Sequence, residues 1–146
     1  MKLNKLLVIT SVFLLAAAAM AIAASSAPVR ANIPFAFYAG DRLLPAGEYE
    51  TYPAATMIVG IRALDSPFEG AFLPSAHNII VKEAKEDACL VFDKYGEDLY
   101  FLRQIWHPMD PTGLETLKSR KETELVSSKV VSGMRPARVI VLARIR

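Results

Sequence analysis

The segment Ala88–Trp106, ACLVFDKYGEDLYFLRQIW, constrains the fold most, because it holds two apolar strand patterns separated by a turn. The expected strands cover about Cys89–Tyr95 and Leu99–Trp106. Gly96 supplies the positive φ that a tight hairpin connection needs, and two acidic residues follow it. The sequence therefore predicts an antiparallel β-hairpin here.

Both faces of the second strand of this hairpin are largely apolar. Strict alternation gives one row of Leu99, Phe101, Arg103 and Ile105 and another of Tyr100, Leu102, Gln104 and Trp106. Neither row is polar enough to face water, so we expect the hairpin to be central and covered on both sides. Its most buried residues should include Phe92, Phe101, Leu102 and Ile105.

The remainder of the chain after Val29 contains short apolar segments separated by turns that hold Gly, Pro or Asp. Segments of this kind are typical of β-strands in a small antiparallel sheet. The predicted fold is therefore all-β. We expect a single antiparallel β-sandwich or partly open barrel of about seven or eight short strands, with one short C-terminal helix.

The predicted helix begins at a capping-box pattern, in which Ser119 and Glu122 would each satisfy a free backbone amide. It would cover about Arg120–Lys129, with Leu125 and Val126 as its apolar anchors. A last strand is expected at Arg138–Ile145. Alternation there gives one row of Val139, Val141, Ala143 and Ile145 and another of Ile140 and Leu142.

The N-terminal residues 1–23 have the pattern of a signal peptide. Lys2 and Lys5 precede an uncharged apolar run, and Ala21-Ile22-Ala23 matches the small-x-small motif of signal peptidase. We expect cleavage after Ala23 and an exported mature chain, 24–146, that forms a single domain with no transmembrane segment. An uncleaved membrane anchor is the alternative, because the apolar run is nearly long enough to span a bilayer.

Charge is unevenly distributed along the mature chain although its total is neutral. Residues 24–117 carry a net charge of −6 and residues 118–146 a net charge of +6. We expect the basic end to fold against the acidic body, with Lys118, Arg120, Lys121 and Lys129 near carboxylates of the 83–87 and 97–98 loops. A neutral, exported chain is not expected to bind nucleic acid.

The inventory of reactive side chains points away from catalysis. Cys89 is the only cysteine, lies in an apolar strand and is expected to be a buried hydrophobic residue. His107 and Asp110 could form a pair, but two ligands are too few for an ordinary zinc site. Glycine-rich phosphate loops and nucleophile elbows are lacking in the sequence. We therefore predict no catalytic residue, metal ligand or cofactor.

Aromatic residues provide the one candidate binding site. Tyrosine and tryptophan rings suit sugar faces and acyl chains alike. The candidates for a ligand pocket are Tyr49, Tyr95, Tyr100 and Trp106. Residues of these types are, however, more often the core and rim of a small β domain, and we favour that interpretation over a ligand pocket.

Three blocks together resemble a family of small exported bacterial proteins to which no activity is assigned. They are Ile33–Glu50 (IPFAFYAGDRLLPAGEYE), Leu90–Trp106 (LVFDKYGEDLYFLRQIW) and Ser119–Leu125 (SRKETEL). The resemblance implies export and a shared fold, and it carries no catalytic residue. The leading expectation is an exported, non-enzymatic structural or interaction protein of the cell envelope or periplasm, whose partners could be envelope components. The alternative is a small β-barrel that binds an apolar or sugar ligand.

Overall fold

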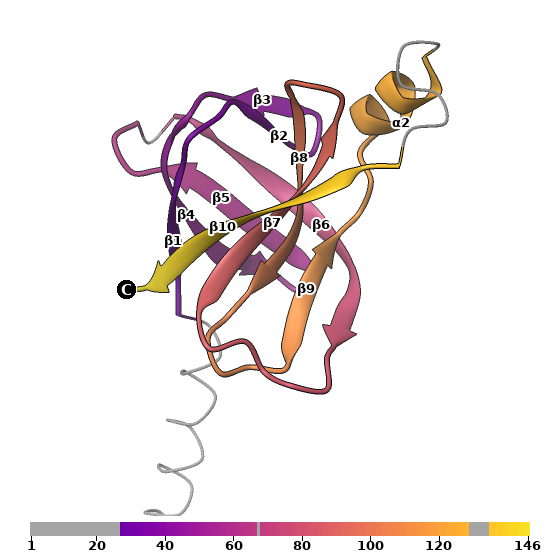
Figure 1. The fold of residues 1–146 in the computed structure, drawn as a ribbon. Helices are drawn as coiled ribbons and strands as arrows, with labels where there is room; N and C mark the ends of the chain where they lie inside the picture. The colour runs from indigo at the N-terminus through magenta and orange to yellow at the C-terminus, as the bar shows by residue number, and fades with distance from the viewer. Residues whose placement is uncertain (1–26, 67, 129–134) are drawn as a thin grey trace, which may run out of the picture.

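The structure, a computed structural model, describes residues 27–66, 68–128 and 135–146. These residues form a β-barrel with one helix at one end (Figure 1). The elements are β1 (Val29–Ile33), β2 (Phe37–Ala39), β3 (Arg42–Leu44), β4 (Gly47–Ala55), β5 (Ile58–Ala63), β6 (Gly70–Ile80), β7 (Ala88–Tyr95), β8 (Leu99–Trp106), β9 (Thr112–Thr116), α2 (Arg120–Ser127) and β10 (Ala137–Ile145). The predicted signal peptide lies outside the described residues. Within the described part of the chain, no helix is long and apolar enough to cross a membrane.

The strands close into a ring. The order β8-β7-β10-β1-β4-β5-β6-β9 returns to β8 through the β8–β9 pairing, and each neighbouring pair is antiparallel. The short hairpin β2–β3 adds to this ring through a parallel contact of β2 with β8. The prediction of an all-β fold with one short helix is confirmed, and the barrel is its form.

The predicted hairpin is central, with β7 and β8 as neighbours in the ring. The exposed fractions of the four residues expected to be most buried are 0% for Phe92, 1% for Ile105, 2% for Phe101 and 3% for Leu102. Gly96 has the expected positive φ of 63°. Residues of both faces of the hairpin belong to buried clusters, so the hairpin is covered on both sides as predicted.

A β-bulge overturns the expected rows of β8. The register between β7 and β8 shifts at Arg103, because Val91 pairs with Gln104 while Phe92 pairs with Leu102. The extra residue reverses the alternation beyond it. Ile105 therefore joins Leu102 in the main core, and Trp106 belongs to a separate cluster on the other face.

Side chains fill the barrel interior. The main core comprises Val29, Ala31, Ile33, Phe37, Ala39, Leu44, Tyr49, Val59, Ile61, Ala63, Leu73, Ala88, Leu90, Phe92, Leu102 and Ile105. The β2–β3 hairpin contributes Phe37, Ala39 and Leu44 to it. A void of about 60 Å³ lies beside Val59, Ile105 and Leu114. That volume suits a water molecule or two and is far below an ordinary ligand pocket of about 300–1,000 Å³.

Helix α2 begins as predicted but uses its capping-box glutamate differently. The Ser119 hydroxyl accepts a hydrogen bond from the Glu122 backbone N–H. The Glu122 carboxylate is directed into a buried cluster on β7 and β8 instead of returning to the cap. Leu125 and Val126 pack against Tyr95 and Phe101, as expected of the apolar anchors.

The basic C-terminal segment contributes β10 to the barrel, but among the described residues the ion pairs expected for Lys118, Arg120 and Lys121 with the 83–87 and 97–98 loops are not formed. Arg120 pairs with Glu124 on its own helix, and the Lys121 backbone N–H donates to Asp41. The acidic body is contacted instead by Arg138, whose Nε lies 2.9 Å from Asp93 Oδ1. Lys129 lies outside the described residues.

Candidate functional site

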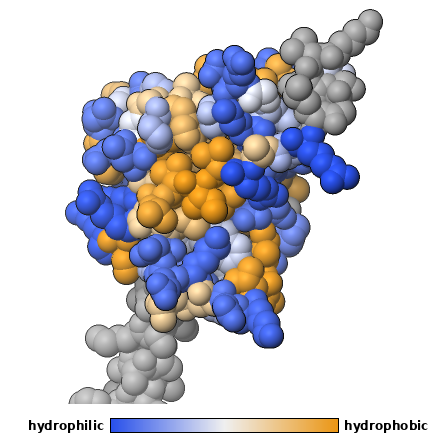
Figure 2. All heavy atoms as spheres, in the orientation of Figure 1, coloured by the Kyte–Doolittle hydropathy of each residue, from blue (hydrophilic) through white to orange (hydrophobic). Residues whose placement is uncertain are grey.

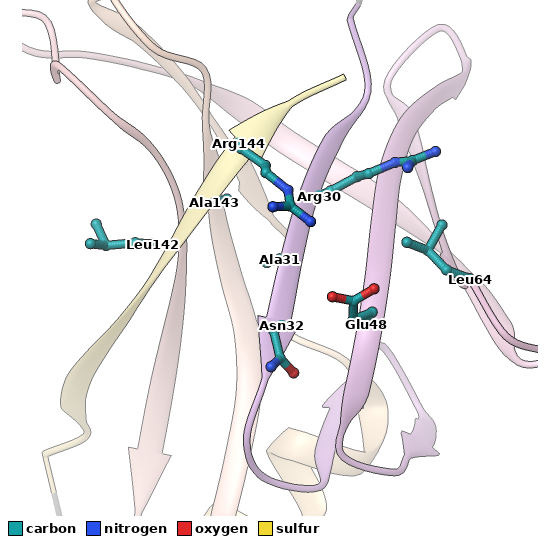
Figure 3. A pocket seen from close by; sticks show the side chains of 8 residues that line it. All are labelled: Arg30, Ala31, Asn32, Glu48, Leu64, Leu142, Ala143 and Arg144. Carbon is teal, nitrogen blue, oxygen red and sulfur yellow. The ribbon is translucent and has the colours of Figure 1, made fainter.

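The wall of the barrel has a weak point between β1 and β10. These strands pair only at Val29–Ile145 and Arg30–Arg144, whereas β10 pairs with β7 from Ala137 to Ala143. Figure 3 shows β10 and β1 diverging away from the Arg30–Arg144 end. We call the gap between β1 residues 31–33 and β10 residues 137–143 the open seam. Along it, one edge of β10 has no backbone partner among the described residues.

The inner side of the open seam is apolar and only partly covered. Val139 and Val141 face the core from β10 but remain partly exposed, unlike the fully buried Leu90 on β7. Phe35, which follows Pro34 after the end of β1, is also partly buried against the main core. Its ring stacks on Tyr100 with a centroid distance of 3.9 Å and meets Phe92 edge-on.

The outer side of the open seam is also apolar. Ile140 and Leu142, which form one of the two rows expected on this strand, are 57% and 68% exposed. Figure 2 shows an apolar patch in the region of β10, rimmed by hydrophilic residues. Large apolar side chains gathered on an outer wall are typical of a surface that contacts another molecule.

A depression of about 420 Å³ lies at the narrow end of the open seam, where Arg30 of β1 pairs with Arg144 of β10. It is lined by Arg30, Ala31, Asn32, Glu48, Leu64, Leu142, Ala143 and Arg144 (Figure 3). Arg144 reaches from β10 toward β1, while Arg30 points across β4. Within the described part of the chain, Arg144 is in no ion pair, so its charge is available to an anionic group.

Arg30 is already engaged in a row of charges beside the depression. Glu50, 1% exposed, accepts from Arg30 Nε at 2.8 Å and from Arg62 Nη2 at 2.6 Å. Burial alone would raise the pKa of Glu50, but hydrogen bonds and charges from the two arginines outweigh it and lower that pKa. The row thus ties β1, β4 and β5 together on the outer wall.

We expect Glu50 to make folding pH-dependent. Its pKa is lower in the folded than in the unfolded chain, so its stabilisation is present above the unfolded pKa of about 4.3 and is lost as the pH falls through the folded value. Urea unfolding at pH 7 and pH 3 should show a smaller loss of stability for Glu50→Gln than for the wild type. Glu48→Gln on the same strand is the matched control. Equal losses for wild type and Glu50→Gln would contradict the assignment.

A second polar cluster lies on the outer face of β7 and β8, beneath α2. Arg103 Nε donates to Asp93 Oδ2 at 2.8 Å, its Nη1 donates to the Thr116 carbonyl at 2.9 Å, and its Nη2 contacts both carboxylate oxygens of Glu122. Tyr95 donates to Glu122 at 3.0 Å. Burial, and then the Glu122 charge, raise the pKa of Tyr95 to about 12, so the phenol stays protonated as a donor. This cluster holds the helix on the barrel.

The four aromatic residues proposed for a ligand pocket lie in separate environments. Tyr49 is in the main core and donates to the Pro45 carbonyl. Tyr95 is under α2, Tyr100 stacks on Phe35, and Trp106 packs on Gly113, where a Cβ would come within 2.6 Å of the indole ring. The structure therefore does not bring the four residues together in one pocket.

The reactive residues are dispersed as well. His107 Nε2 lies 3.1 Å from the Ala27 carbonyl, whereas Asp110 accepts from the Thr112 backbone N–H. Over the described ranges, no group of three or more His, Cys, Asp or Glu side chains could hold a metal. Cys89 is buried with Val91 and Trp106, and burial raises the pKa of its thiol.

Comparisons with known proteins add no relative. No protein-family profile, curated protein or solved structure matches the chain. The chemistry of the open seam therefore has to be argued from its own residues.

Proposed function

We propose that the chain is an exported, non-enzymatic interaction protein of the cell envelope or periplasm, and that it binds its partner with the outer wall of the barrel at the open seam. The observation that carries the proposal is the contrast between the two sides of the wall. The interior is filled by core side chains, whereas Ile140 and Leu142 are exposed beside the unpaired edge of β10.

The sequence supports the cellular location in this proposal. The charged start, apolar run and Ala-x-Ala motif of residues 1–23 are those of an export signal. The resemblance of three sequence blocks to small exported bacterial proteins also supports export. A neutral mature chain also fits an envelope or periplasmic partner better than nucleic acid.

Binding of a small apolar or sugar ligand is the second candidate function. The depression of about 420 Å³ at the seam has the volume for one. However, it is open to solvent and lined by charged as well as apolar side chains, and Tyr49, Tyr95, Tyr100 and Trp106 are not among its lining residues. We therefore prefer a macromolecular partner.

The test is site-specific photo-crosslinking in the native cells. The full chain carries a photoreactive amino acid at Leu142 or, as the control, at Ile80, which is 79% exposed at the end of β6. We expect the mature chain to be found in the envelope or periplasmic fraction with Ala24 as its first residue. We also expect it to form a crosslink from position 142 but not from position 80. Retention in the cytoplasm, or equal crosslinking at both positions, would contradict the proposal.

A further inference from the structure

We propose that the free edge of β10 binds an extended, acidic segment of a partner protein, which adds to the barrel wall as a further strand. This inference rests on the proposed function, because it names the kind of partner that the open seam accepts. The occupied edge covers Ala137–Leu142, where β10 is paired with β7 alone.

The backbone of β10 is the first reason. In an antiparallel ladder, alternate residues direct their N–H and C=O groups to opposite edges. On the seam side these groups have no partner among the described residues from Ala137 to Leu142. An unpaired strand edge is a template for another chain, and main-chain hydrogen bonds supply most of the affinity in strand addition.

The apolar surface beside this edge is the second reason. Val139 and Val141 face the core from β10, yet they are only partly buried. An added strand would cover these side chains from one face. On the other face its side chains would lie beside Ile140 and Leu142, which are exposed on the outer wall.

Charge determines which extended segment fits best. Arg144 stands at the narrow end of the seam, directly opposite Arg30 in the β1–β10 register, and like charges in that position repel. Glu48 also lines the depression, but it lies on β4, away from the edge of β10. A segment with apolar residues at its centre and a carboxylate at each end would place one carboxylate at Arg144, whichever way the segment runs.

The probe is a fluorescein-labelled peptide with the sequence Glu-Val-Thr-Val-Thr-Val-Glu, added to the mature protein. We expect saturable binding by fluorescence anisotropy with a Kd below about 1 mM. Replacing both glutamates by lysine should weaken binding about tenfold. Replacing the central valine by proline should abolish it, because proline removes a main-chain donor and resists a central strand position.

Two protein variants and one mapping experiment locate the binding edge. Arg144→Glu should weaken binding of the glutamate peptide about tenfold, whereas the exposed control Ile80→Glu should leave it unchanged. Hydrogen exchange should show peptide-induced protection in β10 but not in β3, which lies at one end of the strand order, away from the open seam. Protection in β3, insensitivity to Arg144→Glu, or no saturable binding at about 1 mM would overturn the inference.

Self-association is the remaining alternative occupant of this edge. Sedimentation of the mature protein should therefore show a monomer, and a dimer that Leu142→Glu dissociates would overturn the inference in favour of a second copy. If the peptide fails to bind while position 142 still crosslinks in cells, strand addition is wrong but the proposed function stands. If both fail, the proposed function is wrong as well.

Discussion

Replacing Arg103 by methionine is expected to lower the free energy of unfolding by about 3–5 kcal/mol. The guanidinium is 4% exposed and is the cation between the buried carboxylates of Asp93 and Glu122. Methionine has a similar length but no charge, so the buried Glu122 carboxylate would lose its cation, and Asp93 would be left with Arg138 alone. Urea denaturation at pH 7 measures the loss.

The matched control for this variant is Arg120→Met. Arg120 forms an exposed i,i+4 pair with Glu124, which is worth only about 0.3–0.5 kcal/mol. Because Glu122 belongs to α2, hydrogen exchange in Arg103→Met should also show that the helix amides lose protection. A loss below about 1 kcal/mol, with α2 still protected, would show that the cluster does not hold the helix.

Truncating Phe101 to alanine is expected to cost about 3–5 kcal/mol, as for other large aromatic residues in a core. Phe101 is 2% exposed, stacks on Tyr38 at a centroid distance of 4.9 Å and meets Tyr95 edge-on. Removing the ring leaves a cavity between β8 and the helix anchors Leu125 and Val126. The midpoint of denaturant unfolding reports the change.

Phe72→Ala is the control, because this phenylalanine is 69% exposed on β6. We expect its effect to stay within about 0.5 kcal/mol. If Phe101→Ala lowers the free energy of unfolding as little as Phe72→Ala does, the outer face of the hairpin contributes little to stability. Only the inner face of the hairpin would then belong to the stabilising core.

Local pattern was sufficient to predict several elements. The hairpin follows from alternating apolar residues around Gly96, and the helix start follows from Ser119, because these signals act over a few neighbouring residues. The two rows of β10 could be predicted for the same reason, since alternation determines which side chains share a face.

The rows of β8 show where local pattern stops being sufficient. A single charged residue in an apolar strand was visible at Arg103, but its position as the extra residue of a bulge was not. A bulge depends on how the strand pairs with its neighbour, and the side chain is stabilised by partners from β7 and α2 that are distant in sequence.

The open seam was missed for a related reason. Nothing in the sequence of β1 or β10 reveals that they share only two residue pairs, because strand neighbours and register in a closed ring depend on all the other strands. Arg144 is placed opposite Arg30 only by that closure.

The sequence by itself determined the all-β class, the hairpin, the helix start and the alternation of strand faces, because each depends on short-range periodicity and turn chemistry. Tertiary structure alone decided that the sheet closes into a barrel, that Glu122 meets Arg103, and that one edge of β10 remains unpaired. These features depend on long-range pairing, in which each strand's partners are selected by the packing of the whole core.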